Sequence, residues 1–474
     1  MLDAAITCPT MPLTQPSATL PSTPDTATPA PSNPTVAVPP AATPVANGFD
    51  FLTSVFSALP PVQNAQPADP LTAALNANDD PGPYGVNVYE TTFVDENRDN
   101  REVPTKIYYP DSSEGGPYPV IMLSHGLSGN NDANTYLAEH LTSHGYVVVA
   151  AEHVGSNTEA KLEATQVALN QELVAKGFSE EQAAQIAQDA VTGQLSQADI
   201  QGAIQSGLLT QTEAQEIFDN VLKQSTDALY RNPEEWANRP QDISFLLDEL
   251  ETTVAANPQL QAYVDLENVA AVGHSYGAYT SLALAGAGVN MPGSDELTSF
   301  RDERIDTVFA MSPQGQGDDF AITADSYQMI DPDVAMFTIA GENEISRNDI
   351  DNWRMEPYLN SPAEQNYFVS LDGREHRAFS NSGDTQTHEN VEGFALTFLD
   401  ANLKDDPEAI ALLEQAPEGE TRTENRGGIT LLVDTEADAP TPPPETPPST
   451  PPTETPPTPV PPTSGQPTTW LTFG

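Results

Sequence analysis

Short apolar runs alternate with helix-like segments along the middle of the chain. Tyr118–Ser124 and Tyr146–Ala151 are almost continuously apolar, which is typical of strands buried on both faces. Further strands are predicted at Val86–Val94, Val103–Tyr109, Val269–Val272, Thr307–Met311, Ala335–Ile339 and Tyr367–Leu371. Helices are predicted at Asn134–Ser143, Ile243–Thr253, Ala278–Ala285 and Val391–Leu403. This alternation predicts an α/β protein with a mostly parallel, doubly wound sheet.

Residues 156–230 interrupt the alternation with a succession of short helices. Capping hydroxyls with an acceptor three positions later predict four helix starts, in Ser156-x-x-Glu159, Ser179-x-x-Gln182, Ser196-x-x-Asp199 and Thr210-x-x-Glu213. Stop signals precede the last three starts at Gly177, Gly193 and Gly207. One apolar face is predicted from Ile186, Ala190, Ile200, Ile204, Ile217, Phe218 and Val221.

This helical insertion has two interpretations. It is either a packing element or a lid with an apolar underside over an active site. The lid is favoured, because the chain leaves the sheet and returns to it at the carboxyl edge, where ligands bind in open α/β folds.

Both ends of the chain have a linker composition. Residues 1–83 are rich in Pro, Thr, Ala and Ser, and residues 434–474 are rich in Pro and Thr. Such segments cannot bury enough apolar surface to offset the entropy of ordering, so we predict that both are disordered. Residues 84–433 are left as one folded domain.

The chain is strongly acidic, with 17 Lys+Arg against 69 Asp+Glu and a formal charge of −52. Nucleic acid and anionic membranes are therefore excluded as expected partners. Asp95-x-Asn97-x-Asp99 is similar to the start of a calcium loop, but Asn100 stands where glycine is required and Lys106 where the closing glutamate is required. We interpret it as a polar hairpin turn and expect no metal or other cofactor.

The single cysteine, Cys8, excludes an intramolecular disulfide. No apolar stretch is long enough to span a membrane, and the N-terminus lacks the features of a secretion signal. Cys8 precedes a Pro/Thr/Ser-rich stretch, as the lipid-carrying cysteine of a bacterial lipoprotein does. We expect an extracellular or cell-surface protein, tethered through its tails if Cys8 is lipidated.

The strongest chemical signal is Gly273-His-Ser-Tyr-Gly277, which follows a predicted strand and opens a predicted helix. Glycines on both sides of Ser275 allow the tight strand-to-helix turn of a nucleophile elbow, so Ser275 is the predicted nucleophile. The backbone N–H of Tyr276 is the first expected oxyanion donor. The second is the N–H of Leu127, in the loop that follows the Tyr118–Ser124 strand.

A nucleophilic serine also needs a base and an orienting carboxylate. His376 and His388 are the histidines that follow Ser275, and His376 is the predicted base because its loop directly follows a strand. His388 is interpreted as a capping or surface residue, and His125 as a histidine that braces its loop. Glu344 is the predicted acid, with Glu342 as the alternative.

Several segments resemble bacterial α/β-hydrolases related to platelet-activating-factor acetylhydrolase, which are often labelled dienelactone-hydrolase-like. They are Arg98–Pro110, Ser124–Leu127, Asn238–Asp248 and Gly273–Gly277. The resemblance covers about residues 86–403 and implies an α/β-hydrolase fold with Ser275 as nucleophile and His376 as base. Dienelactone hydrolases themselves use a cysteine nucleophile, so their activity is not implied.

The position of the acid departs from the acetylhydrolases, which carry it after the strand that follows the elbow. This chain has Ser312-Pro313 there. Ala340–Ile345 instead resembles cutinase-like polyester hydrolases, whose acid falls at Glu344, and the helical insertion is similar to that of lidded enzymes active on polylactide-like polymers.

Hydrolysis of hydrophobic carboxylic esters, polymeric or lipid, is the expected function. The alternatives are an acetylhydrolase-like phospholipase, a serine peptidase of the same fold and a non-catalytic surface-binding protein.

Overall fold

The structure is a computed structural model that describes residues 78, 80–258, 260–317, 320–346, 350, 352–413 and 429–434. Cys8 and nearly all of the two predicted linkers lie outside the described residues.

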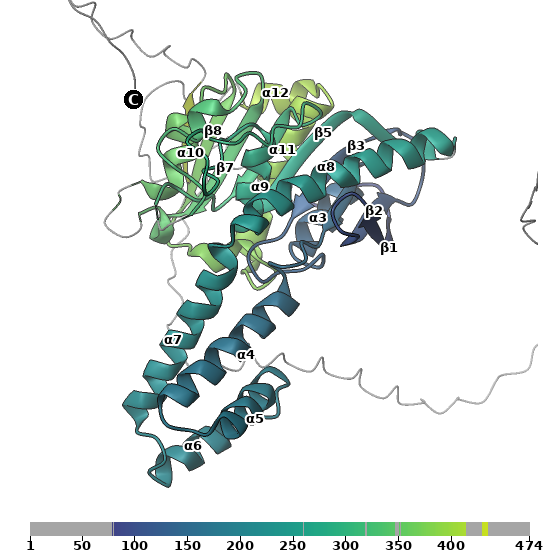
Figure 1. Ribbon diagram of the computed structural model, residues 1–474. Coiled ribbons are helices and arrows are strands. Elements are labelled where there is room, and N and C mark those ends of the chain that lie inside the picture. Colours follow the sequence, from purple (N-terminus) through teal and green to yellow (C-terminus); the bar gives the residue numbers. More distant parts are fainter. Residues whose placement is uncertain are drawn as a thin grey trace, which may run out of the picture. The chain divides into compact units, whose positions relative to one another are not determined.

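The described strands form one nine-stranded sheet in the order β1-β2-β4-β3-β5-β6-β7-β8-β9 (Figure 1). Their bounds are β1 Val86–Asp95, β2 Arg101–Pro110, β3 Tyr118–Ser124, β4 Val147–Ala151, β5 Val264–His274, β6 Thr307–Met311, β7 Ala335–Gly341, β8 Asn366–Leu371 and β9 Ile429–Asp434. Strands β4, β3 and β5 to β8 run parallel, whereas β1, β2 and β9 pair antiparallel at the two edges. The mostly parallel sheet expected from the sequence is confirmed. Strand β9 was not predicted.

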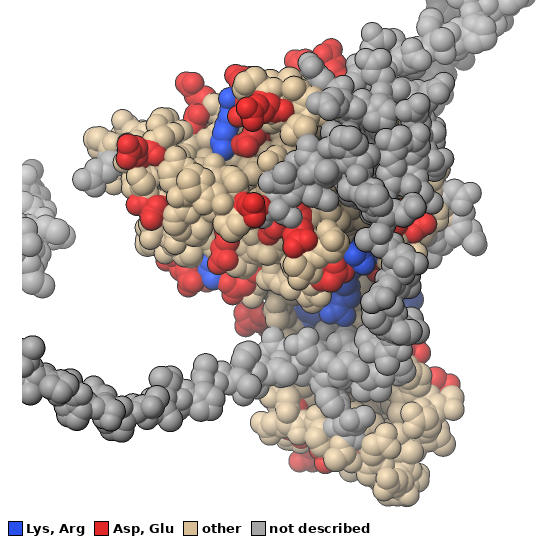
Figure 2. All heavy atoms as spheres, turned by 180° about the vertical axis from the view of Figure 1, so that it is seen from behind, with Lys and Arg blue, Asp and Glu red and all other residues tan. Residues whose placement is uncertain are grey.

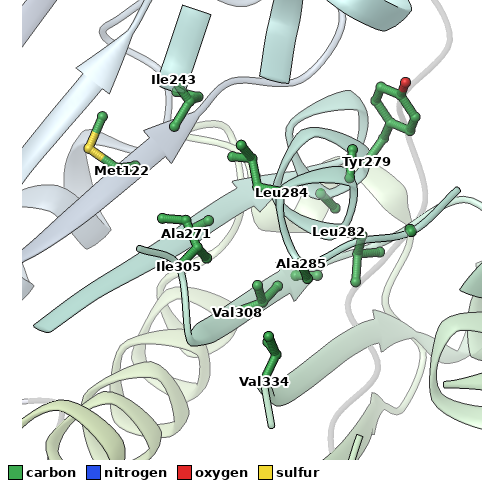
Figure 3. Packing of buried hydrophobic residues seen from close by; sticks show 14 of the residues in the cluster. Met122, Ile243, Ala271, Tyr279, Leu282, Leu284, Ala285, Ile305, Val308 and Val334 are labelled. Carbon is green, nitrogen blue, oxygen red and sulfur yellow. The ribbon is translucent and has the colours of Figure 1, made fainter. Parts of the chain in front are cut away.

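Helices cover both faces of the sheet, because alternate residues of each buried strand point to opposite sides. From β3, Ile121 and Leu123 pack with α3 (Thr135–Ser143) and α11 (Thr385–Leu403). Val120 and Met122 join the opposite cluster, with α8 (Pro233–Ala256) and α9 (Tyr276–Leu284). Figure 3 shows Leu282 and Leu284 of α9 within this second cluster. Short helices complete the described part: α10 Glu356–Asn360, α12 Pro407–Leu413, and the 3₁₀ turns η2 Leu260–Ala262, η3 Tyr327–Met329, η4 Glu342–Glu344, η5 Trp353–Met355 and η6 His376–Phe379.

Helix α8 begins ten residues before the predicted Ile243 and contains Pro240 in its interior. Proline has no N–H, so it leaves the carbonyl of Trp236 without its helical donor. The hydroxyl of Tyr279, on α9, donates to that carbonyl at 2.8 Å. The neighbouring helix thus replaces the missing bond, and α8 continues through the proline.

The insertion consists of α4 Thr158–Ala175, α5 Glu180–Val191, α6 Gln197–Gln205 and α7 Gln211–Tyr230 (Figure 1). The predicted capping boxes at Ser179, Ser196 and Thr210 all form. The predicted start at Ser156 is wrong, because Asn157 caps α4 by accepting from the N–H of Ala160. The Ser156 hydroxyl is instead buried and accepts a hydrogen bond from Arg239.

The described surface carries far more acidic than basic side chains. Figure 2 shows Asp and Glu spread over the visible face of the sheet domain, with few Lys and Arg among them. None of the helices in the described part of the chain has both the length and the apolar character needed to cross a bilayer.

Candidate active site

Ser275 occupies a sharp turn between β5 and α9. Its φ of 56° and ψ of −117° are sparsely populated for a residue with a side chain, so the surrounding structure must hold the turn in place. The Ser275 N–H donates to the Met311 carbonyl at 2.8 Å. A Cβ on Gly273 would lie 2.3 Å from the backbone of Gly277, and one on Gly277 would lie 1.9 Å from the Ser124 carbonyl oxygen. Both glycines are required, as the motif predicts.

The structure brings Ser275, His376 and Glu344 together in a line of hydrogen bonds. The distance between His376 Nε2 and Ser275 Oγ is 2.8 Å, and that between His376 Nδ1 and Glu344 Oε2 is 2.7 Å. An ionised carboxylate only accepts, so Nδ1 carries the proton and Nε2 is free to accept from Ser275. The alternative acid, Glu342, lies on the same turn but is exposed and accepts from the N–H of Gly373.

The Glu344 carboxylate is held by several donors. The hydroxyl of Ser312 and the N–H of Gly341 donate to Oε1, and the Arg354 guanidinium lies 3.1 Å from Oε2. Burial acts to raise the pKa of Glu344, but the hydrogen bond from His376 and the charge of Arg354 outweigh burial and hold the pKa at about 2. The group is therefore a stable anion. Ser312, directly after β6, thus donates to the carboxylate of Glu344, which follows the next strand, β7.

The two predicted oxyanion donors lie on segments that approach Ser275. Tyr276 is the first residue of α9, so its N–H has no acceptor within the helix. A Cβ on Gly126 would lie 3.4 Å from the Cβ of Ser275, which places the loop of Leu127 against the elbow.

Arg239 connects these two segments, and sequence reasoning missed its role. Its fully buried guanidinium donates to the carbonyl of His125 and to the hydroxyls of Thr280 on α9 and Ser156 before α4. It also lies 4.4 Å from the ring centre of Tyr276. The Asn238–Asp248 resemblance contains Arg239, but its contacts come from elements far apart in the sequence.

Three buried histidines brace the surroundings of Ser275. His125 accepts from the N–H of His153 and hydrogen-bonds to the carbonyl of Gly126, which agrees with the structural role expected for it. His153 contacts Asp242 at 3.0 Å. His274 hydrogen-bonds to the backbone carbonyl of His376 at 3.0 Å. Burial and then the charge of His376 lower the pKa of His274 to about 3, so His274 stays neutral and holds the His376 loop.

The remaining candidates lie away from this group. His388 stacks on Tyr136 and hydrogen-bonds to the carbonyl of Ser380 at 2.9 Å. It is half-buried and does not cap α11, because Asp384 is the capping residue. In the first hairpin, Asp95 accepts from the N–H of Asn97 and from Arg98, so this motif is a polar turn. The described residues contain no cluster of three side chains suited to a metal ion.

Ser275 opens into a cavity of about 940 Å³, which we call the Ser275 cavity. His376, Arg354 and Arg377 also line it, and one face of α7 forms its far wall. That face consists of Asp219, Leu222, Lys223, Thr226, Asp227 and Tyr230. The predicted apolar underside of the insertion is therefore wrong. The apolar residues of α7, such as Ile217 and Val221, pack with α4 and α5 within the insertion.

A comparison with protein families finds that residues 80–226 match the chlorophyllase family. The match covers under a third of the chain, from just before β1 to near the end of α7. No curated protein matches the chain. Because the match ends before Ser275, it bears on the first half of the sheet domain and on the insertion, and it leaves the hydrogen-bonded side chains to be judged on their geometry.

Proposed function

We propose that this chain, which belongs to the α/β-hydrolase superfamily, is a serine hydrolase that cleaves carboxylic esters through an acyl-enzyme. The observation that carries the proposal is the line of hydrogen bonds from Ser275 through His376 to Glu344 at the wall of the Ser275 cavity. The match to the chlorophyllase family supports an ester hydrolase of α/β-hydrolase type.

In the first half of the reaction, the Ser275 oxygen attacks the ester carbonyl carbon and its proton passes to Nε2 of His376. The ionised Glu344 stabilises the resulting imidazolium through Nδ1. The carbonyl oxygen becomes an oxyanion, which the N–H groups of Tyr276 and Leu127 stabilise. The imidazolium then protonates the leaving alcohol, and the acyl group remains on Ser275.

In the second half, water replaces the alcohol. His376 removes a proton from the water, which attacks the acyl carbon and forms a second oxyanion in the same donor pair. Collapse of this intermediate returns the proton to Ser275 and releases the carboxylic acid. Arg354 and the hydrogen bond from His376 keep the Glu344 carboxylate ionised through both halves of the reaction, since its pKa of about 2 lies far below neutral pH.

Replacing Ser275 with alanine tests this proposal. We expect Ser275→Ala to lower kcat for p-nitrophenyl acetate by roughly 10⁶-fold and to abolish labelling by a fluorophosphonate probe. Ser380→Ala is the matched control, because Ser380 lines the same cavity but its hydroxyl donates to the Arg377 carbonyl. Unchanged labelling of Ser275→Ala would contradict the proposal. Cleavage of peptide amides by the wild type that is lost in Ser275→Ala would assign the site to a peptidase.

A further inference from the structure

The helices of the insertion line a second, partly open cavity of about 430 Å³, which we call the insert cavity. All four helices contribute to its lining, through residues such as Leu169 of α4, Ile186 of α5, Ile200 of α6 and Ile217 of α7. Among the described residues that line it, the polar ones are Thr165, Asp199 and Ser225. Asp199 belongs to the capping box of α6, and the Ser225 hydroxyl donates within α7.

The walls of the insert cavity do not close on one another. Leu162, Ile186 and Ile200 remain half-exposed although they face the same space, and Leu208 is 63% exposed. Protein interiors are normally packed to the density of organic crystals, and half-exposed Leu and Ile side chains gain free energy when an apolar ligand covers them. The insert cavity therefore has the chemistry of a site for a hydrocarbon.

Helix α7 is the wall between the two cavities. Its Ile217, Val221 and Ser225 line the insert cavity, whereas Asp219, Lys223 and Thr226 line the Ser275 cavity. Leu222 lines both cavities and is 41% exposed. The two cavities therefore approach each other at Leu222, on the edge of α7.

The polar side chains of α7 in the Ser275 cavity favour the ester group there and an apolar tail in the insert cavity. Asp219, Lys223 and Asp227 on the α7 side of the Ser275 cavity offer a long apolar tail little transfer energy. The insert cavity removes such a tail from water, at about fourfold in affinity for each buried methylene.

We propose that the insert cavity binds a long aliphatic chain of the ester substrate while the ester group lies at Ser275, with the chain passing Leu222. This inference rests on the proposed function, and it makes the insertion a determinant of chain-length specificity.

The kinetic test uses the full chain and p-nitrophenyl esters from acetate to palmitate. Leu222→Trp should obstruct the path, and Ala203→Phe should fill the insert cavity. Each should lower kcat/KM for palmitate by about 100-fold relative to kcat/KM for acetate, equivalent to between three and four methylenes at about fourfold each. Val167→Trp is the matched control, because Val167 is 56% exposed on α4 and lines neither cavity. Equal losses for acetate and palmitate would overturn the inference, and so would no loss for palmitate together with no loss for an ester of a long-chain alcohol.

The aliphatic chain can belong to the acid or to the alcohol of the ester, and a second substrate pair separates the two. If the acyl chain enters, Leu222→Trp affects palmitate esters of short alcohols. If the alcohol chain enters, the same variant affects hexadecyl acetate. Either result supports the insert cavity as the chain site.

A binding measurement separates failure of this inference from failure of the proposed function. Ser275→Ala should bind a fluorescent palmitate analogue, and the added Ala203→Phe change should abolish that binding. If the wild type hydrolyses no ester yet this binding pattern holds, the proposed function fails and the hydrocarbon site stands. If esters are hydrolysed but the analogue binds equally with and without Ala203→Phe, the hydrocarbon site is refuted.

Discussion

Two helices of equal length show how differently the sheet domain and the insertion are built. In α9, Tyr276–Leu284, all nine residues are buried. In α6, Gln197–Gln205, none of the described side chains is buried. Helix α9 lacks a side-chain cap and is held by its surroundings, whereas α6 is started by a complete capping box.

The difference teaches that different interactions determine the local conformation in the two regions. Tertiary contacts hold the Ser275 turn in a conformation that local propensity disfavours. In the insertion, local hydrogen bonds define each helix, and the tertiary packing leaves an apolar cavity between them. Substitutions near the sheet should therefore lower the stability of the whole domain, whereas those in the insertion should lower stability only slightly and locally.

The largest expected contrast is between two carboxylates. Glu344→Gln should lower kcat for p-nitrophenyl acetate by up to about 10⁴-fold, because it removes the charge that orients and stabilises the His376 imidazolium. Glu342→Gln, on the same turn, and Glu213→Gln, in the capping box of α7, should leave kcat nearly unchanged. Steady-state kinetics at neutral pH measure this. A larger loss for Glu342→Gln would reverse the assignment of the acid.

The next contrast concerns packing. Leu282→Ala should destabilise the protein by about 2 to 5 kcal/mol, since Leu282 is 1% exposed and its truncation leaves a new cavity in the core. Ile204→Ala, on the half-exposed side of α6, should change stability by less than about 0.5 kcal/mol. Urea unfolding followed by the fluorescence of Trp236 and Trp353 measures both. Similar losses would show that the insertion and the sheet domain share one cooperative core.

Acid should weaken the sheet domain selectively. Burial, the main cause in each case, lowers the pKa of His153 and His274 to about 3 and that of His125 well below its usual value of 6.5. The unfolded chain binds protons at these histidines as pH falls below 6.5, whereas the folded chain does not. Stability therefore falls with pH, by up to about 1.4 kcal/mol per unit for each histidine.

The insertion contains no histidine, which gives an internal control for this prediction. Hydrogen exchange, corrected for intrinsic rates, should show loss of protection in β3 and β5 between pH 7 and pH 5. Helices α5 and α6 should be affected much less. Stability that is constant over this interval would contradict the neutral, buried state of the three histidines.

The smallest expected effect is the loss of a cap. Ser179→Ala removes the acceptor for the N–H of Gln182 and should destabilise α5 by about 1 kcal/mol. Faster hydrogen exchange should be confined to α5, with protection of α9 and kcat for p-nitrophenyl acetate unchanged. Slower turnover in this variant would indicate that the insertion is coupled to Ser275 and His376.

The sequence predicted those features that rest on local patterns. The apolar runs of β3 and β4, the glycines around Ser275 and three capping boxes all identify themselves within a few residues. The position of His376 in a loop directly after a predicted strand favoured it over His388. Strand β9 was missed because a single apolar run near a Pro-rich segment gives no sign of which sheet edge it joins.

Contacts between distant elements could not be predicted. Arg239 and Arg354 are buried cations whose partners come from several loops, and nothing in the residues beside them distinguishes them from surface arginines. The choice between Glu342 and Glu344 depends on the direction of a 3₁₀ turn. The polar face of α7 was missed because the apolar residues of this helix were expected to face the active site. They face the other helices of the insertion instead.

The strand order has a consequence for how the protein is made. Strand β3 pairs with β4 on one side and with β5 on the other. The insertion lies between β4 and β5 in the sequence. Synthesis proceeds from the N-terminus, and helices stabilised by contacts of short sequence separation form rapidly. The helices of the insertion are therefore complete before β5 exists. Ser275 and His376 are 101 positions apart, so the hydrogen bond between them cannot form until β8 and the loop beyond it have left the ribosome.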